Sequence, residues 1–175
     1  MSRAQDLRAT RMNEAVALNG ADLLAYFGRR VSPSEDAADL LGETLVTVWR
    51  RVADLPSDEL RARMWMFGVA RRVLANYNRG NRRRWELASK LRRELAAHPA
   101  EYASRVDHSD IWADVDALPG AQRELIVLVH GDGFTVTEAA RVLSISASTA
   151  RTRYATALKA LQLAYSDGES SGIRL

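Results

Sequence analysis

The sequence predicts an all-α protein in which a linker joins two small helical domains. Over most of the chain, apolar residues recur at steps of three and four, which is typical of one face of an α-helix, and no useful length alternates as a strand would. The stretch 86–109 breaks this pattern because it is rich in Ala, mixed in charge and interrupted by His98–Pro99. A chain of 175 residues can form two small cores. We therefore expect helical domains over 10–85 and 110–165, a linker over 86–109 and a tail over 166–175.

The first domain begins with two expected helices. An amphipathic helix covers 21–30, after a break at Asn19–Gly20. The next begins at Ser32, which can form a capping box with Glu35, and runs to about Val52. Its apolar residues fall on one side, and the side turned to solvent carries Asp36, Asp39, Glu43 and Arg50. We expect an acidic outward face on this helix.

A third helix, from about Asp58 to Arg79, is expected after a turn at 54–57. Residues spaced to face the second helix are Leu60, Met64, Phe67, Leu74 and Tyr77. From Arg71 to Trp85 the chain carries six arginines and no acidic residue. Arginine attracts phosphate, Trp and Tyr can stack on unpaired bases, and Asn can bond base edges. Taken alone, such a run is more often a solvated basic face.

Four helices are expected in the second domain. Two cover 111–118 and 121–130, and they end at Pro119–Gly120 and Gly131–Gly133. Thr135 and Glu138 then make a capping box, and small and aliphatic residues after it let two short helices cross closely. This pattern is typical of a helix-turn-helix, and it predicts DNA binding.

The last helix begins after Ser146, a good N-cap. Its first turns, where a recognition helix meets bases and phosphates, show Ser148, Thr149, Arg151, Thr152 and Arg153. Between Phe134 and Leu163 the only acidic residue is Glu138, against four basic ones. An ordinary helical hairpin with a solvated Arg face is the alternative, but the charge favours DNA. With a helix-turn-helix in the same chain, the upstream arginine run also favours nucleic acid.

The composition argues against other classes of protein. No cysteine is present, which excludes disulfides and thiolate metal sites and fits a reducing cytosol. The three histidines, His98, His108 and His130, lack metal-ligand spacing. Neither a Ser-His-Asp arrangement nor a Gly-rich phosphate loop is evident. An enzyme is therefore the weakest hypothesis, and no cofactor or metal is expected. The N-terminus mixes charged and apolar residues without a continuous hydrophobic segment. We expect a cytoplasmic protein with no membrane insertion.

Three segments carry a family resemblance. Asp36–Trp49 resembles the second conserved region of group 4 (extracytoplasmic-function) sigma factors of the sigma-70 family, and Arg63–Tyr77 resembles the stretch that follows it there. Leu118–Leu161 resembles their fourth region. The likeness extends from about Leu23 to Leu161 in the family's order and spacing. It implies a region 2 bundle and a region 4 helix-turn-helix.

The resemblance also implies what each segment contacts. The clamp of the largest subunit of core RNA polymerase would be bound by Asp36, Asp39, Leu40, Glu43 and Trp49. The −10 element would be opened and held by Trp65, Arg71, Arg72, Asn76, Tyr77, Arg79, Arg82 and Arg83. A pocket in the loop over 54–63 would receive an unstacked base. The −35 element would be read as duplex in the major groove by the first turns of the last helix.

The chain departs from the family pattern in three places. Gly42 stands where Gln is common, which weakens the clamp contacts and adds a flexible residue inside a helix. Ser144 stands at the turn position usually held by Gly, so either it accepts a left-handed conformation or the turn differs. Ala155, Thr156 and Leu158 replace basic or aromatic residues, which predicts weaker −35 binding.

One alternative function and three partners complete the expectations. A stand-alone helix-turn-helix regulator is the alternative function, because the fourth-region pattern alone is shared with other regulators. It leaves the acidic helix and the arginine run unexplained. Because many relatives are silenced by an anti-sigma protein, the resemblance implies such a partner for this chain, together with core polymerase and promoter DNA.

Overall fold

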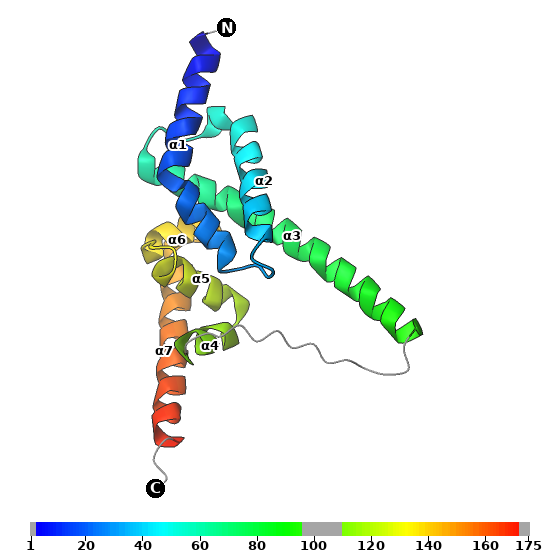
Figure 1. Cartoon of the computed structure of the whole chain (residues 1–175). Helices are drawn as coiled ribbons and strands as arrows, with labels where there is room; N and C mark the ends of the chain where they lie inside the picture. The colour runs from blue at the N-terminus through cyan, green and yellow to red at the C-terminus, as the bar shows by residue number, and fades with distance from the viewer. Residues whose placement is uncertain (1–2, 96–109, 172–175) are drawn as a thin grey trace. The chain divides into compact units, whose positions relative to one another are not determined.

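A computed structural model of the chain describes residues 3–95 and 110–171 and separates it into two compact units, Met1–Arg105 and Val106–Leu175 (Figure 1). Within the described residues every regular element is helical, so the predicted all-α fold of two helical domains is confirmed. Unit 1 contains α1 (Arg3–Gly28), α2 (Asp36–Arg50), the short 3-10 helix η1 (Val52–Asp54) and α3 (Glu59–Leu95). Unit 2 contains α4 (Asp110–Ala117), α5 (Gly120–His130), α6 (Val136–Leu143) and α7 (Ala147–Ser171). None of the helices, over the residues described, is long and apolar enough to cross a membrane.

The core of unit 1 forms where α1, α2 and α3 pack against one another. Tyr26 and Phe27 of α1 and Phe67 of α3 are almost fully buried, and Tyr26 meets the other two rings edge to face at centroid distances of 5.2 and 5.4 Å. Val48 of α2 is completely buried beside them in the same bundle. Aromatic pairs of this geometry add about 0.5–1.5 kcal/mol each beyond the area that they bury. This core fixes the outward faces of α2 and α3.

α1 differs from the predicted helix over 21–30 because it runs unbroken through Asn19–Gly20. The Asn19 side chain is buried and donates a hydrogen bond to the Ala15 carbonyl, at 3.0 Å, one turn earlier in the same helix. Asparagine disfavours a helix when its side chain bonds backbone groups in a non-helical conformation. Here the side chain bonds a carbonyl of its own helix. The predicted break is therefore wrong.

α2 begins at Asp36 rather than at Ser32–Pro33, and no side chain caps it. The Asp36 N–H donates to the Pro33 carbonyl at 3.3 Å and the Ala37 N–H to the Ser34 carbonyl at 3.1 Å. These bonds span three residues, so Pro33–Asp36 is a turn that leads into the helix. The predicted capping box of Ser32 and Glu35 does not form because α2 begins four residues after Ser32, so that Glu35 and not Ser32 is at the N-cap position.

α3 continues past Arg79 to Leu95, into the range predicted as linker. The residues after Gly80 as far as Leu95 include many strong helix formers (Arg, Leu, Ala, Lys, Glu) and no proline. Residues 96–109 lie outside the described part of the chain, so the remainder of the predicted linker is not tested. Of the residues expected to face α2, Met64, Phe67 and Leu74 are buried, whereas Leu60 is exposed and was wrongly placed.

Unit 2 places the helix-turn-helix on a small core. Val115, Leu118, Ile126 and Ala157 cluster where α4, α5 and α7 meet. Within α6, Ala139 and Ala140 are buried, which allows α6 and α7 to pack closely. The helices predicted over 111–118 and 121–130 match α4 and α5 within a residue. α7 extends to Ser171, which is further than the frayed tail predicted from 166.

Candidate functional site

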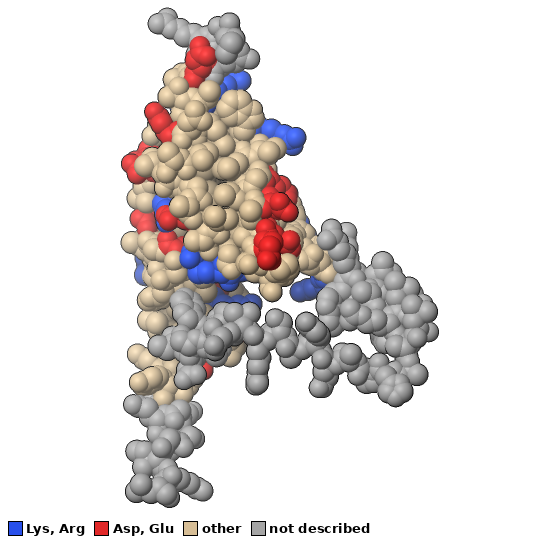
Figure 2. Space-filling model, in the orientation of Figure 1, with Lys and Arg blue, Asp and Glu red and all other residues tan. Residues whose placement is uncertain are grey.

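The exposed face of α2 is acidic at its beginning and apolar and basic at its end. Asp39 and Glu43 are exposed one turn apart, and Val46 and Arg50 continue the same stripe. Figure 2 shows acidic side chains gathered on the side of unit 1 where α2 begins. Trp49 stands beside the stripe with 49% of its surface exposed, which is high for the largest apolar side chain. The structure thus brings Asp39, Glu43 and Trp49 to one surface.

Two other residues predicted for this surface have different roles. Leu40 is 4% exposed and packs in the core of unit 1, so in the free chain it stabilises the bundle, and its contact with polymerase stays a prediction. Asp36 is half-buried and accepts a hydrogen bond from the Tyr77 hydroxyl of α3. Asp36 and Tyr77 therefore tie α2 to α3, and both were predicted as ligand contacts.

One face of α3 carries half of the residues predicted to open and hold the −10 element. Trp65, Arg72, Asn76 and Arg79 are spaced by seven, four and three residues, so they lie along one side of the helix. Val69, on the same side, is buried, and the three residues that follow it there are exposed. The Arg79 guanidinium donates to the Asn76 side-chain carbonyl. Arg71, half-buried, and Arg82, exposed, lie on a neighbouring stripe. Arg83 lies on α3 but outside the residues whose side chains are described.

Trp65 is half-buried, and its ring is not open to a base on both faces. The Arg51 guanidinium carbon lies 5.4 Å from the ring centroid. Arg51 is held there by Asp54, at 2.9 and 3.0 Å from two of its nitrogens. A base that stacks on this face of Trp65 must displace Arg51.

A hollow of about 400 Å³ adjoins the loop predicted to contain a base-receiving pocket. The Arg11 guanidinium of α1 donates to the Leu55 carbonyl and so fixes the start of this loop. Buried Asn19 of α1 also borders the hollow. The remaining lining residues are Glu14, Ala15, Leu18, Pro56, Ser57, Glu59 and Ala62. The contribution of α1 was not evident from the sequence, because it depends on residues far from the loop along the chain.

The helix-turn-helix has the local geometry that its sequence predicts. The Glu138 N–H donates to the Thr135 hydroxyl at 3.3 Å and the Thr135 N–H to the Glu138 carboxylate at 2.8 Å, which confirms the capping box. Ser144 adopts the left-handed conformation, with φ 57° and ψ 41°, so serine replaces the usual glycine without changing the turn. The Thr149 N–H donates to the Ser146 hydroxyl at 3.1 Å, which confirms Ser146 as the cap of α7.

The hydroxyl groups at the start of α7 are bonded to one another in the free protein. The Ser146 hydroxyl lies 2.9 Å from that of Ser148 and 2.8 Å from that of Thr149. Thr152 donates to the Ser148 carbonyl at 3.1 Å. Arg151 is exposed and Arg153 half-buried on the same turns. These arginines carry the positive charge that α7 offers at its beginning.

A polar contact between α5 and α7 was not predicted. Nε2 of His130, the last residue of α5, lies 2.9 Å from the Tyr154 hydroxyl, and the two rings stack at 5.9 Å between centroids. The Tyr154 ring also packs against the core of unit 2. The residues are 24 positions apart, and no sequence signal joins them. This contact fixes α7 against α5 one turn after Arg151.

The part of the chain that the structure describes holds no group of three or more His, Asp or Glu side chains arranged to bind a metal ion.

Comparisons with known proteins match a family model to part of each unit. The family model of sigma-70 region 2 matches residues 16–84, and that of sigma-70 region 4 matches residues 111–161. The chain is 30% identical over 149 residues to the ECF RNA polymerase sigma factor EcfG of Rhodopseudomonas palustris (strain TIE-1), covering 83% of this chain and 81% of the relative. It is 31% identical over 166 residues to the ECF RNA polymerase sigma factor SigF of Caulobacter vibrioides, covering 92% of this chain and 89% of the relative.

Two solved structures share the fold. CnrH, in complex with the cytosolic domain of CnrY, superposes with a TM-score of 0.60 at 24% identity over 92% of this chain and 96% of CnrH. The sigma factor RpoE of Bartonella quintana, in complex with the anti-sigma factor NepR, superposes with a TM-score of 0.55 at 24% identity over 90% of this chain and 95% of RpoE.

Proposed function

This chain belongs to the sigma-70 family of RNA polymerase sigma factors, in its extracytoplasmic-function group, and from that premise we propose that it directs core polymerase to a set of promoters. Proteins of this family regulate transcription initiation and are not enzymes. One observation carries the proposal: region 2 over 16–84 and region 4 over 111–161 occur together in the family order. A stand-alone helix-turn-helix regulator would need only the second.

Core polymerase is proposed to bind the outward face of α2. Asp39 and Glu43 offer two exposed carboxylates on consecutive turns, and Trp49 offers apolar surface beside them. Exposed acidic side chains favour a basic partner surface and speed the encounter with it. Leu40 is left out of this set because it is buried.

The −10 element is proposed to lie along α3. Arg72, Arg79 and Arg82 are exposed and can neutralise phosphates, while Asn76 between them can reach a base edge. An unstacked base would enter the hollow beside the loop that Arg11 fixes. Unstacking a base costs a few kcal/mol, which a matched pocket can offset.

The −35 element is proposed to be read as duplex by α7. The helix presents the exposed side chains Ser148, Arg151 and Thr152 in its first turns, and the caps at Thr135 and Ser146 fix its direction. Arginine is the side chain that most often pairs with guanine in the major groove. The other two predicted contacts, Thr149 and Arg153, are half-buried and lie at the edge of this face.

A protein inhibitor is the remaining proposed partner. Both structural relatives were solved as complexes, one of them with an anti-sigma factor. A partner that covers the polymerase-binding face of α2 would keep the chain from core polymerase. Action on polymerase and promoter places the proposed function in the cytoplasm.

Reconstituted transcription tests the proposal. Core polymerase and the chain are combined on a pool of genomic fragments, and run-off transcripts are sequenced; we expect transcripts that share −35 and −10 sequences and that core polymerase alone does not make. Replacing Asp39 and Glu43 by Lys should abolish them by removing core binding, whereas Asp116→Lys, a charge reversal at an exposed acid of α4, should not. If the chain binds duplex promoters but starts no transcript with core polymerase, it is a stand-alone regulator.

A further inference from the structure

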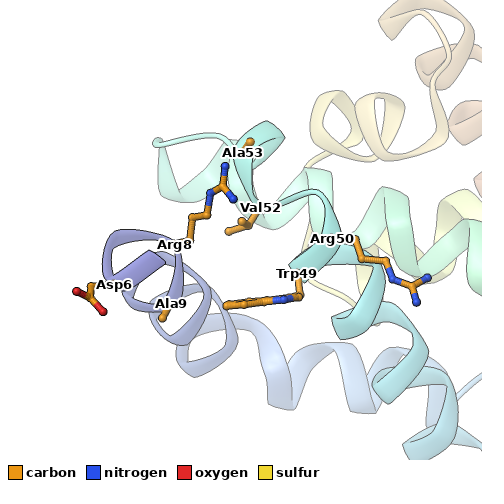
Figure 3. A pocket seen from close by; sticks show the side chains of 7 residues that line it. All are labelled: Asp6, Arg8, Ala9, Trp49, Arg50, Val52 and Ala53. Carbon is orange, nitrogen blue, oxygen red and sulfur yellow. The ribbon is translucent and has the colours of Figure 1, made fainter. Parts of the chain in front are cut away.

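A second hollow, of about 660 Å³, lies between the beginning of α1 and the end of α2 (Figure 3). α1 contributes Asp6, Arg8 and Ala9; the end of α2 contributes Trp49 and Arg50; η1 contributes Val52 and Ala53. In Figure 3 the Trp49 ring extends from α2 toward Ala9 of α1. The hollow is unrelated to the one beside the base-receiving loop, with which it shares no residue.

The walls of this hollow are apolar, and the helices of unit 1 leave it open. Ala9 and Ala53 are too short to fill the space between α1 and η1, and Trp49 keeps 49% of its surface in contact with solvent. Tryptophan is the residue type most enriched among those that dominate binding energy at protein interfaces, and it acts by filling or lining a desolvated pocket. The hollow therefore suits a bulky apolar side chain that belongs to a partner protein.

The charge at the rim indicates what accompanies that side chain. Arg8 and Arg50 are both exposed and border the hollow, with Asp6 as the single acidic residue there. The acidic part of the same helix face, at Glu43, is seven residues before Arg50, or about 10 Å along the axis. Along its axis, α2 thus presents first a negative surface and then a positive one. A partner that covers both must carry basic groups opposite Glu43 and carboxylates opposite Arg50.

We infer that the hollow is a second docking point for core polymerase, which takes a bulky apolar side chain from a polymerase segment that also carries carboxylates. The inference rests on the proposed function, because it extends the polymerase-binding face of α2 onto α1. Trp49 joins the two surfaces, since it stands beside the acidic stripe and lines the hollow. Opposite charges at the two ends permit one direction of docking and oppose the reversed one. Arg8 is the specificity residue that this assignment adds.

Filling the hollow from inside tests the inference. Ala9→Trp places an indole in the space without adding charge, and Ala17→Trp, at an exposed position of the same helix away from the hollow, is the matched control. The affinity of each full-length variant for core polymerase is measured by fluorescence anisotropy, with the thermal unfolding midpoint as a check on the fold. Ala9→Trp should weaken core binding at least tenfold, and Ala17→Trp should change it less than twofold. Equal effects of the two would overturn the inference.

A second variant keeps the test decisive if Ala9→Trp unfolds. Arg8→Glu reverses one rim charge at an exposed position and should weaken core binding at least fivefold, with a smaller effect at high salt. If Arg8→Glu and Ala9→Trp leave core affinity unchanged while Lys at Asp39 and Glu43 reduces it, the hollow is not a polymerase contact and the proposed function stands. If the Lys variant also binds normally, the polymerase face of α2 is itself wrong. A dimer in sedimentation that Ala9→Trp dissociates would assign the hollow to a second copy of this chain and overturn the inference.

Discussion

Replacing Gly42 by alanine should stabilise unit 1 although the new methyl group contacts nothing. Gly42 lies inside α2 on its exposed face, and a Cβ atom there would meet no other side chain or element within 4 Å. The substitution therefore introduces no clash, and it removes backbone freedom that glycine keeps in the unfolded chain. The expected gain in unfolding free energy is about 0.5–1 kcal/mol.

Gly133 provides the opposite case in the second unit. Its surroundings are equally open, but its φ is +75°, in the left-handed region that L-residues rarely adopt. There the Cβ atom of alanine would crowd the backbone, at a cost of about 1–2 kcal/mol. Gly133→Ala should therefore destabilise unit 2. Because neither site has a neighbour to clash with, backbone conformation alone decides that one substitution stabilises the protein and the other destabilises it.

Scanning calorimetry of the full-length chain can measure both effects. A change of 1 kcal/mol moves the unfolding midpoint of a domain of this size by about 4–8 °C. We expect the transition of unit 1 to rise by several degrees in Gly42→Ala, and that of unit 2 to fall by a similar or larger amount in Gly133→Ala. A fall in Gly42→Ala, or shifts of the same sign in both, would refute the reasoning.

Three further outcomes are expected. Gly42→Gln should bind core polymerase more tightly than Gly42→Ala in anisotropy titrations, because the two share the gain in stability and only glutamine adds a side chain to the proposed interface; equal affinities would contradict this. Tyr154→Phe should lower the unfolding free energy of unit 2 by about 0.5–1.5 kcal/mol and weaken −35 duplex binding, and in a double-mutant cycle with His130→Phe the two effects should not add. The slope of log K against log salt for −35 duplex should be no steeper than about −4, since the helix-turn-helix offers only Arg141, Arg151, Arg153 and Lys159 to phosphate.

The features that the sequence predicted correctly are those set by neighbouring residues. The caps at Thr135 and Ser146 each join groups three positions apart. A local bond of this kind depends mainly on neighbouring residues, so a sequence pattern can indicate it. At Ser144 the sequence left two alternatives, and the structure has the left-handed one. The acidic face of α2 was predictable because helical spacing places Asp39 and Glu43 together.

The errors occur where tertiary packing overrides local preference. Asn19–Gly20 is a typical end of a helix, yet Asn19 is buried in unit 1 and α1 continues through both residues. Ser32 is a good N-cap, but α2 begins four residues later. The hollow at Trp49 requires α1 and η1 to meet, which no periodicity in the sequence indicates.

Several of the residues predicted to bind DNA make internal contacts before DNA is bound. Tyr77 bonds Asp36, Asn76 bonds Arg79, Arg51 covers Trp65, and the hydroxyls of Ser148 and Thr149 bond Ser146. A contact that one of these residues makes with DNA replaces an internal contact, so its net contribution is smaller than that of a free side chain. Arg72 of α3 and Arg151 of α7 are exposed and take no part in these bonds, so each retains more of its binding energy toward phosphate.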